Sequence, residues 1–192
     1  MTNPFTTFDP PLSGPPVLAP TDVSYVLEDT DVGRLLIAVT ASGAVVTCAY
    51  APDTASEDRW LTRIASGVSP RVLRHAKPTD AVRRALAAYL AGTTRSVDVR
   101  PDLALASQFQ REVLTGLAAQ VGYGERTTYA VLASAVAHPG AARAVGTALG
   151  ANPLCIVLPC HRVLPAAGGV GGYAGGPAAK KHLLALEAAH AA

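Results

Sequence analysis

Hydrophobic and polar positions follow strand-like spacing in the first half of the chain. From Val23 to Tyr50 the sequence VSYVLEDTDVGRLLIAVTASGAVVTCAY has β-branched and apolar runs separated by the turns Asp-Val-Gly and Ala-Ser-Gly. This pattern predicts an antiparallel ribbon of short strands. Helical spacing follows in DAVRRALAAYLAG, with Thr79 or Asp80 able to cap its start and Gly92 its end. We therefore expect a small α+β unit, followed by an extended strand at RSVDVRPDLA that runs into a linker.

The spacing becomes helical after Pro101. An amphipathic pattern covers SQFQREVLTGLAAQV, with Ser107 placed as its N-cap. Beyond the glycine-broken loop GYGERTTY, two short helical patterns, TTYAVLASAVA and ARAVGTALGA, flank the turn HPGA. This outline is typical of a helix-turn-helix, although many helical hairpins share it and bind nothing. A last helix is predicted at AAKKHLLALEAAH, where Glu187 is available to orient a histidine.

A cysteine stands beside a histidine and an arginine in LPCHRV. The apolar run LCIVLP before it predicts a buried strand or extended segment that ends at Pro159, so Cys160 lies where this segment meets a loop or a helix start. A thiol attacks as the thiolate, which forms near neutral pH when a helix N-terminus or a cationic or proton-accepting neighbour lowers its pKa. His161 and Arg162 are candidates for that role. Adjacent side chains can also point apart, and most buried cysteines are inert packing residues, so both interpretations stay open.

Glycines surround Tyr173 in GGVGGYAGG. Such a loop can bring its backbone close to a flat ligand and present N–H groups to it. The same glycine content is equally typical of a plain flexible loop.

Composition and charge exclude some classes of protein. The first 20 residues contain six prolines and no apolar period, which predicts a disordered or extended arm. The net charge of +2 makes no case by itself for nucleic-acid binding. Three cysteines at spacings that suggest no disulfide framework, and no charged-then-apolar leader, favour a cytoplasmic location. Every apolar run is broken before the ~20 residues that a membrane span needs, so we expect a soluble protein with no membrane partner.

Five motifs follow one another through the second half of the chain: GERTTYAVLA, GAARAVGTALGANP, LPCHRV, GGYAGG and KKHLLALE. In this order and at this spacing they resemble the O6-alkylguanine-DNA alkyltransferase family. The resemblance covers roughly Ser107 to Glu187. Before it, only VGRLLIAV and the helix predicted from Asp80 to Leu90 are similar to the family's N-terminal domain.

The resemblance implies an α+β fold with two domains. A small N-terminal antiparallel sheet plus helix, of ribonuclease H-like form, would be followed by a mainly helical C-terminal domain with a helix-turn-helix. We expect a Pro-rich arm at residues 1–20, the N-terminal domain at 21–100, and the DNA-binding and alkyl-acceptor domain at 101–192.

The resemblance also implies a methylated-DNA-[protein]-cysteine S-methyltransferase. Such a protein flips O6-alkylguanine, and by extension O4-alkylthymine, out of duplex DNA and transfers the alkyl group irreversibly to its own cysteine, here Cys160. The thioether is not cleaved by water, so the protein reacts once. His161 matches the family histidine that takes the thiol proton through an ordered water, and Glu187 the carboxylate that fixes the tautomer of that histidine.

Further site residues follow from the same resemblance. Tyr129 matches the tyrosine that donates a hydrogen bond to the leaving guanine and crowds the phosphate to turn the nucleotide out. Asn152 matches the asparagine that ties the recognition helix to the active-site segment. The substrate pocket would be formed by Tyr173, Ala174, Gly175 and Val163.

The DNA-binding role falls on the second short helix, AARAVGTALGA. Arg143 matches the residue that fills the gap in the base stack, and a guanine must leave the stack because a buried sulfur cannot otherwise reach it. Small residues such as Ala142 and Gly146 allow close backbone approach, and in the family this helix enters the minor groove. The resemblance thus implies a monomer that binds double-stranded alkylated DNA independently of sequence.

Several positions depart from the family pattern. Leu114 stands where tryptophan is frequent and Gly122 where proline is frequent, and both look like packing changes. Ala174 lacks the hydroxyl of the serine found in some members. Some members hold structural zinc through N-terminal cysteines and histidines, but only Cys48 and His75 are available here, too few for a tetrahedral site. We expect no metal and no cofactor.

Two alternative functions remain. A related class binds alkylated DNA as a sensor without transfer because its cysteine is replaced, and the presence of Cys160 argues against it. A cysteine hydrolase would use the same Cys-His pair, but it would need an oxyanion site and would turn over repeatedly. One equivalent of reaction, as opposed to steady turnover, separates the hydrolase from the transferase.

Overall fold

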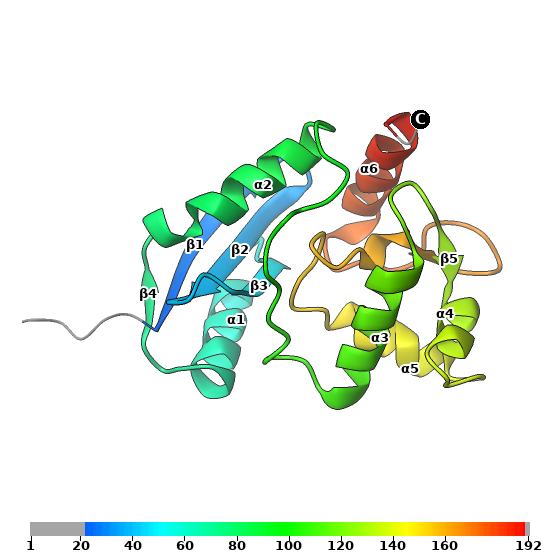
Figure 1. The fold of residues 1–192 in the computed structure, drawn as a ribbon, viewed down its shortest axis with the longest axis horizontal. Helices are drawn as coiled ribbons and strands as arrows, with labels where there is room; N and C mark the ends of the chain where they lie inside the picture. The colour runs from blue at the N-terminus through cyan, green and yellow to red at the C-terminus, as the bar shows by residue number, and fades with distance from the viewer. Residues whose placement is uncertain (1–21, 191–192) are drawn as a thin grey trace, which may run out of the picture.

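The computed structural model describes residues 22–190. The Pro-rich arm predicted at residues 1–20 lies outside the described residues. Within them, a four-stranded sheet with two helices occupies the first half of the chain and a group of helices the second (Figure 1). The mixed α+β class predicted from the sequence is confirmed.

The sheet has the strand order β3-β2-β1-β4. Strands β1 (Val23–Thr30), β2 (Gly33–Thr40) and β3 (Val45–Tyr50) pair antiparallel, as predicted. Strand β4 (Val72–Arg74) pairs parallel to β1. The predicted antiparallel sheet is confirmed for β1, β2 and β3, whereas the added parallel strand β4 makes the whole sheet mixed. The crossover through helix α1 (Thr54–Gly67) is long enough to carry the chain back and start β4 in the direction of β1.

Strand β2 is buried on both faces, which explains its nearly continuous apolar run. Leu35, Ile37 and Val39 share a cluster with residues of helix α2 (Asp80–Leu90), and the alternate residues Leu36 and Ala38 share a second cluster with α1. A short 3-10 turn, η1 (Lys77–Thr79), leads into α2. The predicted helix at 80–90 is confirmed, whereas α1 and β4 were not predicted.

The predicted helices of the second half are confirmed. Helix α3 (Gln108–Gln120) begins with a capping box in which Ser107 and Gln110 exchange side-chain-to-backbone hydrogen bonds. The other elements are β5 (Thr127–Thr128), α4 (Tyr129–Ala135), α5 (Ala142–Gly150), the 3-10 turn η2 (Cys160–Arg162), β6 (Val163–Leu164) and α6 (Gly176–Ala189). Strands β5 and β6 form a two-stranded parallel pair.

Two predicted extended segments form no regular strand. In RSVDVRPDLA only Pro101 makes an isolated bridge, to Val45. In LCIVLP, Leu154 bridges to Cys48, and the chain then turns tightly with Ile156 at φ 71°. LCIVLP is apolar because it is buried against other elements, whereas RSVDVRPDLA is mostly exposed and only its Val97 is buried.

The outer edge of β3 holds the two halves of the chain together. The backbone N–H of Val45 donates to the carbonyl of Arg100 at 2.8 Å, and that of Cys48 donates to the carbonyl of Pro153 at 2.8 Å. The larger hydrophobic cluster includes buried residues of the sheet, α2, α3, α5 and α6. The segment before Cys160 is thus fixed directly against the sheet.

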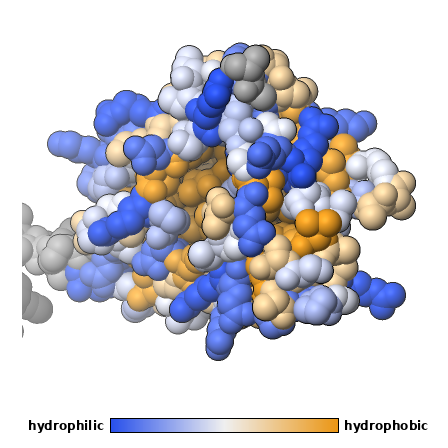
Figure 2. Space-filling view, turned by 45° about the vertical axis from the view of Figure 1, so that its right-hand side comes forward, coloured by the Kyte–Doolittle hydropathy of each residue, from blue (hydrophilic) through white to orange (hydrophobic). Residues whose placement is uncertain are grey.

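The surface and the helix lengths add two observations. On the face seen in Figure 2, hydrophilic side chains project widely and hydrophobic residues lie in hollows between them. Between residues 22 and 190, none of the helices has the length and apolar character needed to cross a membrane.

Candidate active site

Cys160 lies at the start of η2 and is almost completely buried. The side-chain amide of Asn152 donates to Sγ of Cys160 at 3.2 Å and to the carbonyl of Leu158 at 3.1 Å. The amide oxygen of Asn152 accepts from the N–H of Leu154 at 2.9 Å. Asn152 therefore ties the end of α5 to the segment that carries Cys160, as the resemblance implies, and it also contacts the sulfur itself.

The surroundings of Cys160 lower the pKa of its thiol. Hydrogen bonding from the Cys155 thiol has the largest effect, burial opposes it, and the Asn152 amide and the positive charge of Lys180 add to it. Lys180 is fully buried on α6, where its ammonium donates to the carbonyl of Val163 at 2.7 Å. Each of these groups stabilises a thiolate at this position.

His161 is fully buried beside Glu187 of α6. Its Nε2 lies 2.8 Å from Oε1 of Glu187, and its Nδ1 has no partner among the described residues. Burial lowers the pKa of His161, which keeps the imidazole neutral. With Nε2–H donated to the carboxylate, the neutral ring leaves the lone pair of Nδ1 available as an acceptor or base.

Glu187 is held ionised by several donors. Burial raises the pKa of its carboxyl, but hydrogen bonds from His161, Arg162 and Tyr89 outweigh burial and bring the pKa to about 2. Arg162 donates from Nη2 to Oε1 at 2.8 Å, and the N–H of Gly124 donates to Oε2 at 3.2 Å. Arg162 was a candidate to activate the thiol, but the structure places it on the carboxylate instead.

A cavity of about 290 Å³ opens beside Cys160. This volume is close to the lower end of the roughly 300–1,000 Å³ typical of small-molecule sites. It is lined by residues of α4, α5, η2 and the glycine loop, namely Tyr129, Gly146, Leu149, Gly150, Cys160, Gly172, Tyr173 and Ala174.

Val163 and Gly175, both predicted for the substrate pocket, pack against other residues. Val163 is fully buried in the core beneath the site. Gly175 lies against the ring of Tyr50, so closely that a Cβ built on it would be 2.3 Å from the Tyr50 ring. Neither residue is among those that line the cavity.

Helix α5 presents small residues on its outer side. Arg143, Ala144 and Thr147 are exposed, whereas Val145 and Leu149 are buried in the core. Gly146 faces Tyr129, with 3.7 Å between a Cβ built on the glycine and the tyrosine ring. Arg143 therefore stands on the same helix as one wall of the cavity, on the exposed side.

Three residues of the site were not identified from the sequence: Lys180, Tyr89 and Cys155. A signal for Lys180 exists, because it shares the spacing of Leu183, Leu184 and Glu187 on the buried face of α6. Tyr89 and Cys155 gave no such signal, since Tyr89 reaches the site through tertiary packing and Cys155 through a tight turn.

Two residues that depart from the family pattern, Leu114 and Gly122, each have defined surroundings in the structure. Leu114 is fully buried in the core. The N–H of Gly122 donates to the Glu125 carboxylate at 2.7 Å, a bond that proline could not make. In residues 22–190, no three His, Cys, Asp or Glu side chains are grouped so that they could hold a metal ion.

Comparison with known proteins places this site in a family. Residues 108–189 match the family described as 6-O-methylguanine DNA methyltransferase, DNA binding domain. The chain is 49% identical over 105 residues to the methylated-DNA–protein-cysteine methyltransferase of Mycolicibacterium paratuberculosis, and 46% identical over 102 residues to that of Salmonella typhimurium. These matches cover 55% and 53% of the chain and span 62% and 59% of the relatives' own length.

The structural likeness extends over nearly the whole chain. The crystal structure of Mycobacterium tuberculosis OGT in complex with DNA is similar with a TM-score of 0.73 and 32% identity, covering 87% of this chain and 94% of that one. The O6-methylguanine-DNA methyltransferase of Pyrococcus kodakaraensis is similar with a TM-score of 0.61 and 28% identity, covering 86% and 98%. The likeness includes the N-terminal sheet as well as the cysteine-bearing half, and the chain therefore belongs to the methylated-DNA–protein-cysteine methyltransferase family.

Proposed function

We propose that this protein repairs DNA by transferring the alkyl group of O6-alkylguanine, and of O4-alkylthymine, to Sγ of Cys160 in a single turnover. One observation carries the proposal: Cys160 lies at a cavity of about 290 Å³, next to a donor amide and a buried His161–Glu187 pair. A nucleophile, a base and an orienting carboxylate are the groups that such a transfer needs.

The reaction begins with loss of the thiol proton. Nδ1 of His161 takes this proton through a water molecule, because Nε2–H is already donated to Glu187. The Cys160 thiolate attacks the alkyl carbon, the C–S bond forms, and the bond from carbon to guanine O6 breaks with its electron pair on the guanine. Water does not cleave the resulting thioether, so each molecule reacts once.

Donors at the cavity stabilise the leaving guanine. Tyr129 lines the cavity at the start of α4, and its hydroxyl donates to the departing base. The loop around Tyr173 and Ala174 offers backbone N–H groups on another wall. Charge gathers on the guanine as it leaves, so such donors stabilise the transition state more than the ground state.

DNA binds along α4 and α5, which together serve as the helix-turn-helix. The exposed small residues of α5 let its backbone approach the minor groove without reading base edges, and Ala142 and Gly146 contribute to this approach. Arg143 enters the base stack and fills the gap that the extruded nucleotide leaves. Extrusion costs a few kcal/mol, which contacts to the sugar-phosphate backbone offset.

The remaining parts support this domain. The sheet with α1 and α2, a ribonuclease H-like unit from residue 21 to 100, braces the alkyl-acceptor domain at 101–192 through the β3 edge. The protein acts as a monomer in the cytoplasm, without metal or cofactor, on double-stranded DNA of any sequence.

Replacement of the nucleophile tests the proposal. Cys160→Ser is expected to abolish methyl transfer from a duplex that carries O6-methylguanine, while the affinity for that duplex stays within about twofold, because α5 is unchanged. Cys155→Ser and Cys48→Ser are the matched controls and should keep the ability to transfer. Transfer by Cys160→Ser at the original rate, or repeated turnover by the wild-type protein, would show that the site performs another reaction.

A further inference from the structure

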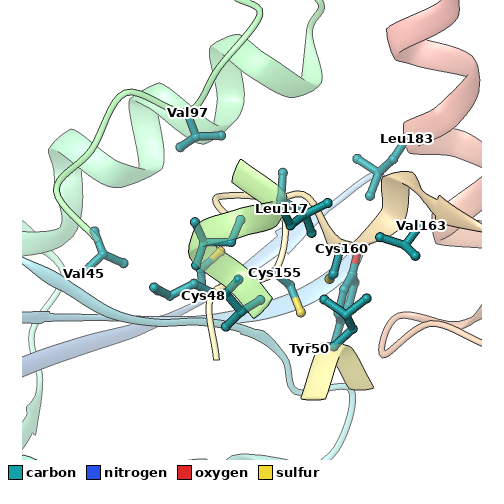
Figure 3. Packing of buried hydrophobic residues seen from close by; sticks show 14 of the residues in the cluster. Val45, Cys48, Tyr50, Val97, Leu117, Cys155, Cys160, Val163 and Leu183 are labelled. Atoms are coloured by element: carbon teal, nitrogen blue, oxygen red, sulfur yellow. The ribbon is translucent and has the colours of Figure 1, made fainter. Parts of the chain in front are cut away.

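Cys155 lies beside Cys160 although four residues separate the two in sequence. A tight turn brings them together: the N–H of Leu158 donates to the carbonyl of Leu154 at 2.8 Å, and the N–H of Val157 to the carbonyl of Cys155 at 2.8 Å. Figure 3 shows the two side chains next to each other in the core. Cys155 is 1% exposed.

Asn152 links the two sulfurs. Its side-chain amide donates to Sγ of Cys160 at 3.2 Å, and its backbone carbonyl accepts from the thiol of Cys155 at 3.6 Å. The S–H of Cys155 thus donates to the Asn152 carbonyl, and the sulfur of Cys160 is its second acceptor through the hydrogen bond that lowers the pKa of the Cys160 thiol.

We propose that Cys155 is a positioning residue that donates its S–H to the Cys160 thiolate and so favours the reactive form of the nucleophile. This inference rests on the proposed alkyl transfer. While Cys160 is a thiol, the Cys155 proton is donated to the Asn152 carbonyl. When Cys160 loses its proton toward His161, the thiolate becomes the stronger acceptor and receives the Cys155 S–H.

The proton of Cys155 stays on its own sulfur throughout. The hydrogen bond with Cys160, burial and the charge of Cys160 hold the pKa of Cys155 well above its ordinary value, so it remains a donor. After transfer, the sulfur of Cys160 is an uncharged thioether and a weak acceptor, and the Cys155 S–H returns to the carbonyl. No oxidant or further reactant is needed.

Other titratable and charged groups also surround Cys160. They are Cys48 and Tyr50 on β3, Tyr129 on α4, Tyr173 in the glycine loop, Lys180 on α6, and the cluster of His161, Arg162 and Glu187. Cys48 provides a matched control, because burial raises the pKa of its thiol to about 12 and its backbone N–H donates to the carbonyl of Pro153.

The test compares variants at position 155 across a pH series. Cys155→Ala removes the donor, Cys155→Val removes it while filling the space, and Cys155→Ser retains a hydroxyl donor. In single-turnover methyl transfer at pH 7, the alanine and valine variants should be slower by about threefold to tenfold, the value of a weak donor to a charged acceptor. The serine variant and Cys48→Ala should stay within about twofold of wild type.

The pH dependence separates hydrogen bonding from packing. A lower thiol pKa increases the thiolate fraction more than it reduces nucleophilicity, so the advantage of Cys155 is confined to pH values at which Cys160 is partly protonated. The rates of Cys155→Ala and wild type should therefore converge at high pH. The proposal would be overturned by a loss of rate that is equal at every pH or by a serine variant as slow as the alanine variant. It would also be overturned if Cys48→Ala changed the pH dependence of the rate in the same way as Cys155→Ala.

Alkylation of Cys160 by iodoacetamide, followed by peptide mass, provides a second readout without DNA. Its pH profile should move to higher pH in Cys155→Ala and Cys155→Val, and an unmoved profile would overturn the inference. If wild type failed to take a methyl group from DNA, the proposed function would fail, while this profile would still decide the role of Cys155.

Discussion

At the scale of single residues, the site depends on how a buried carboxylate is satisfied. Glu187 is 1% exposed, yet it accepts hydrogen bonds from the side chains of His161, Arg162 and Tyr89 and from the N–H of Gly124. This set of donors keeps it ionised and fixes the tautomer of His161. The free Nδ1 acceptor of His161 is therefore set by residues that are not among those lining the cavity.

The acid dependence of stability reports on Glu187. Its pKa falls from an ordinary 4.5 to about 2, so its stabilisation is fully present above pH 4.5 and is lost as the pH falls toward 2. Such a difference corresponds to about 3 kcal/mol of unfolding free energy. Glu187→Gln should remove this pH-dependent part of the stability. Unfolding free energies from urea denaturation, measured from pH 6 down to the acid limit, should therefore change less with pH in the variant than in wild type. Parallel curves for variant and wild type would contradict this account.

Two substitutions at the cavity test where the leaving guanine is stabilised. An added hydroxyl in Ala174→Ser is worth roughly 1 kcal/mol, so it should change single-turnover transfer by less than about tenfold. Tyr129→Phe removes a donor that no backbone group replaces and should slow transfer more. A large gain from the serine, or no loss from the phenylalanine, would place the stabilisation elsewhere.

At the scale of elements, the sequence predicts best where local signals and burial agree. Ser107 and Gln110 form the capping box that starts α3, and the period of α5 matches its buried face. Helix α1 was not predicted because its only fully buried residues are Ser56 and Ile64, so its apolar stripe is short. The segment before Cys160 resembles a strand in sequence, but it is shaped by Asn152 and the edge of β3.

The same distinction applies to the site. Cys160, His161 and Glu187 could be predicted as site residues from motifs, because each belongs to a short pattern that resembles the family. The effects of Lys180 and Cys155 on the nucleophile could not, since they arise from the packing of α6 and from a turn at positive φ.

The exposed position of Arg143 on α5 leads to a prediction about this element. Arg143→Ala should slow repair of methylated duplex DNA far more than reaction with free O6-benzylguanine, because only the duplex requires extrusion of a base. The ratio of the two single-turnover rates measures the effect. Equal losses on both substrates would instead assign Arg143 to the chemistry or to the fold.

At the scale of the whole molecule, the sheet and the acceptor half behave as parts of one core. Strand β3 pairs at its edge with the segments around Pro101 and Leu154, and Tyr50 at its end packs edge-to-face on Tyr173 with ring centroids 5.5 Å apart. Gly175, at the start of α6, allows this contact because it has no side chain. The glycine loop of the cavity is therefore positioned by the N-terminal sheet.

A pair of glycine variants tests this link. Gly175→Ala would place Cβ 2.3 Å from the Tyr50 ring, and such overpacking typically costs about 1–3 kcal/mol of stability. Gly172→Ala is the matched control for stability, because a Cβ there meets nothing within 4 Å. Thermal unfolding should show a clearly lower melting temperature for Gly175→Ala and little change for Gly172→Ala. Similar melting of both would mean that the Tyr50 contact does not join the two halves.

The central claim, irreversible transfer to Cys160, is tested most directly by intact mass. The wild-type protein is mixed with a duplex oligonucleotide that carries one O6-methylguanine, and its mass is measured before and after, with peptide mapping. We predict a gain of one methylene group per protein molecule, located on Cys160, with no further turnover on added DNA. An unchanged mass, or a methyl group on Cys48 or Cys155 instead, would contradict the account.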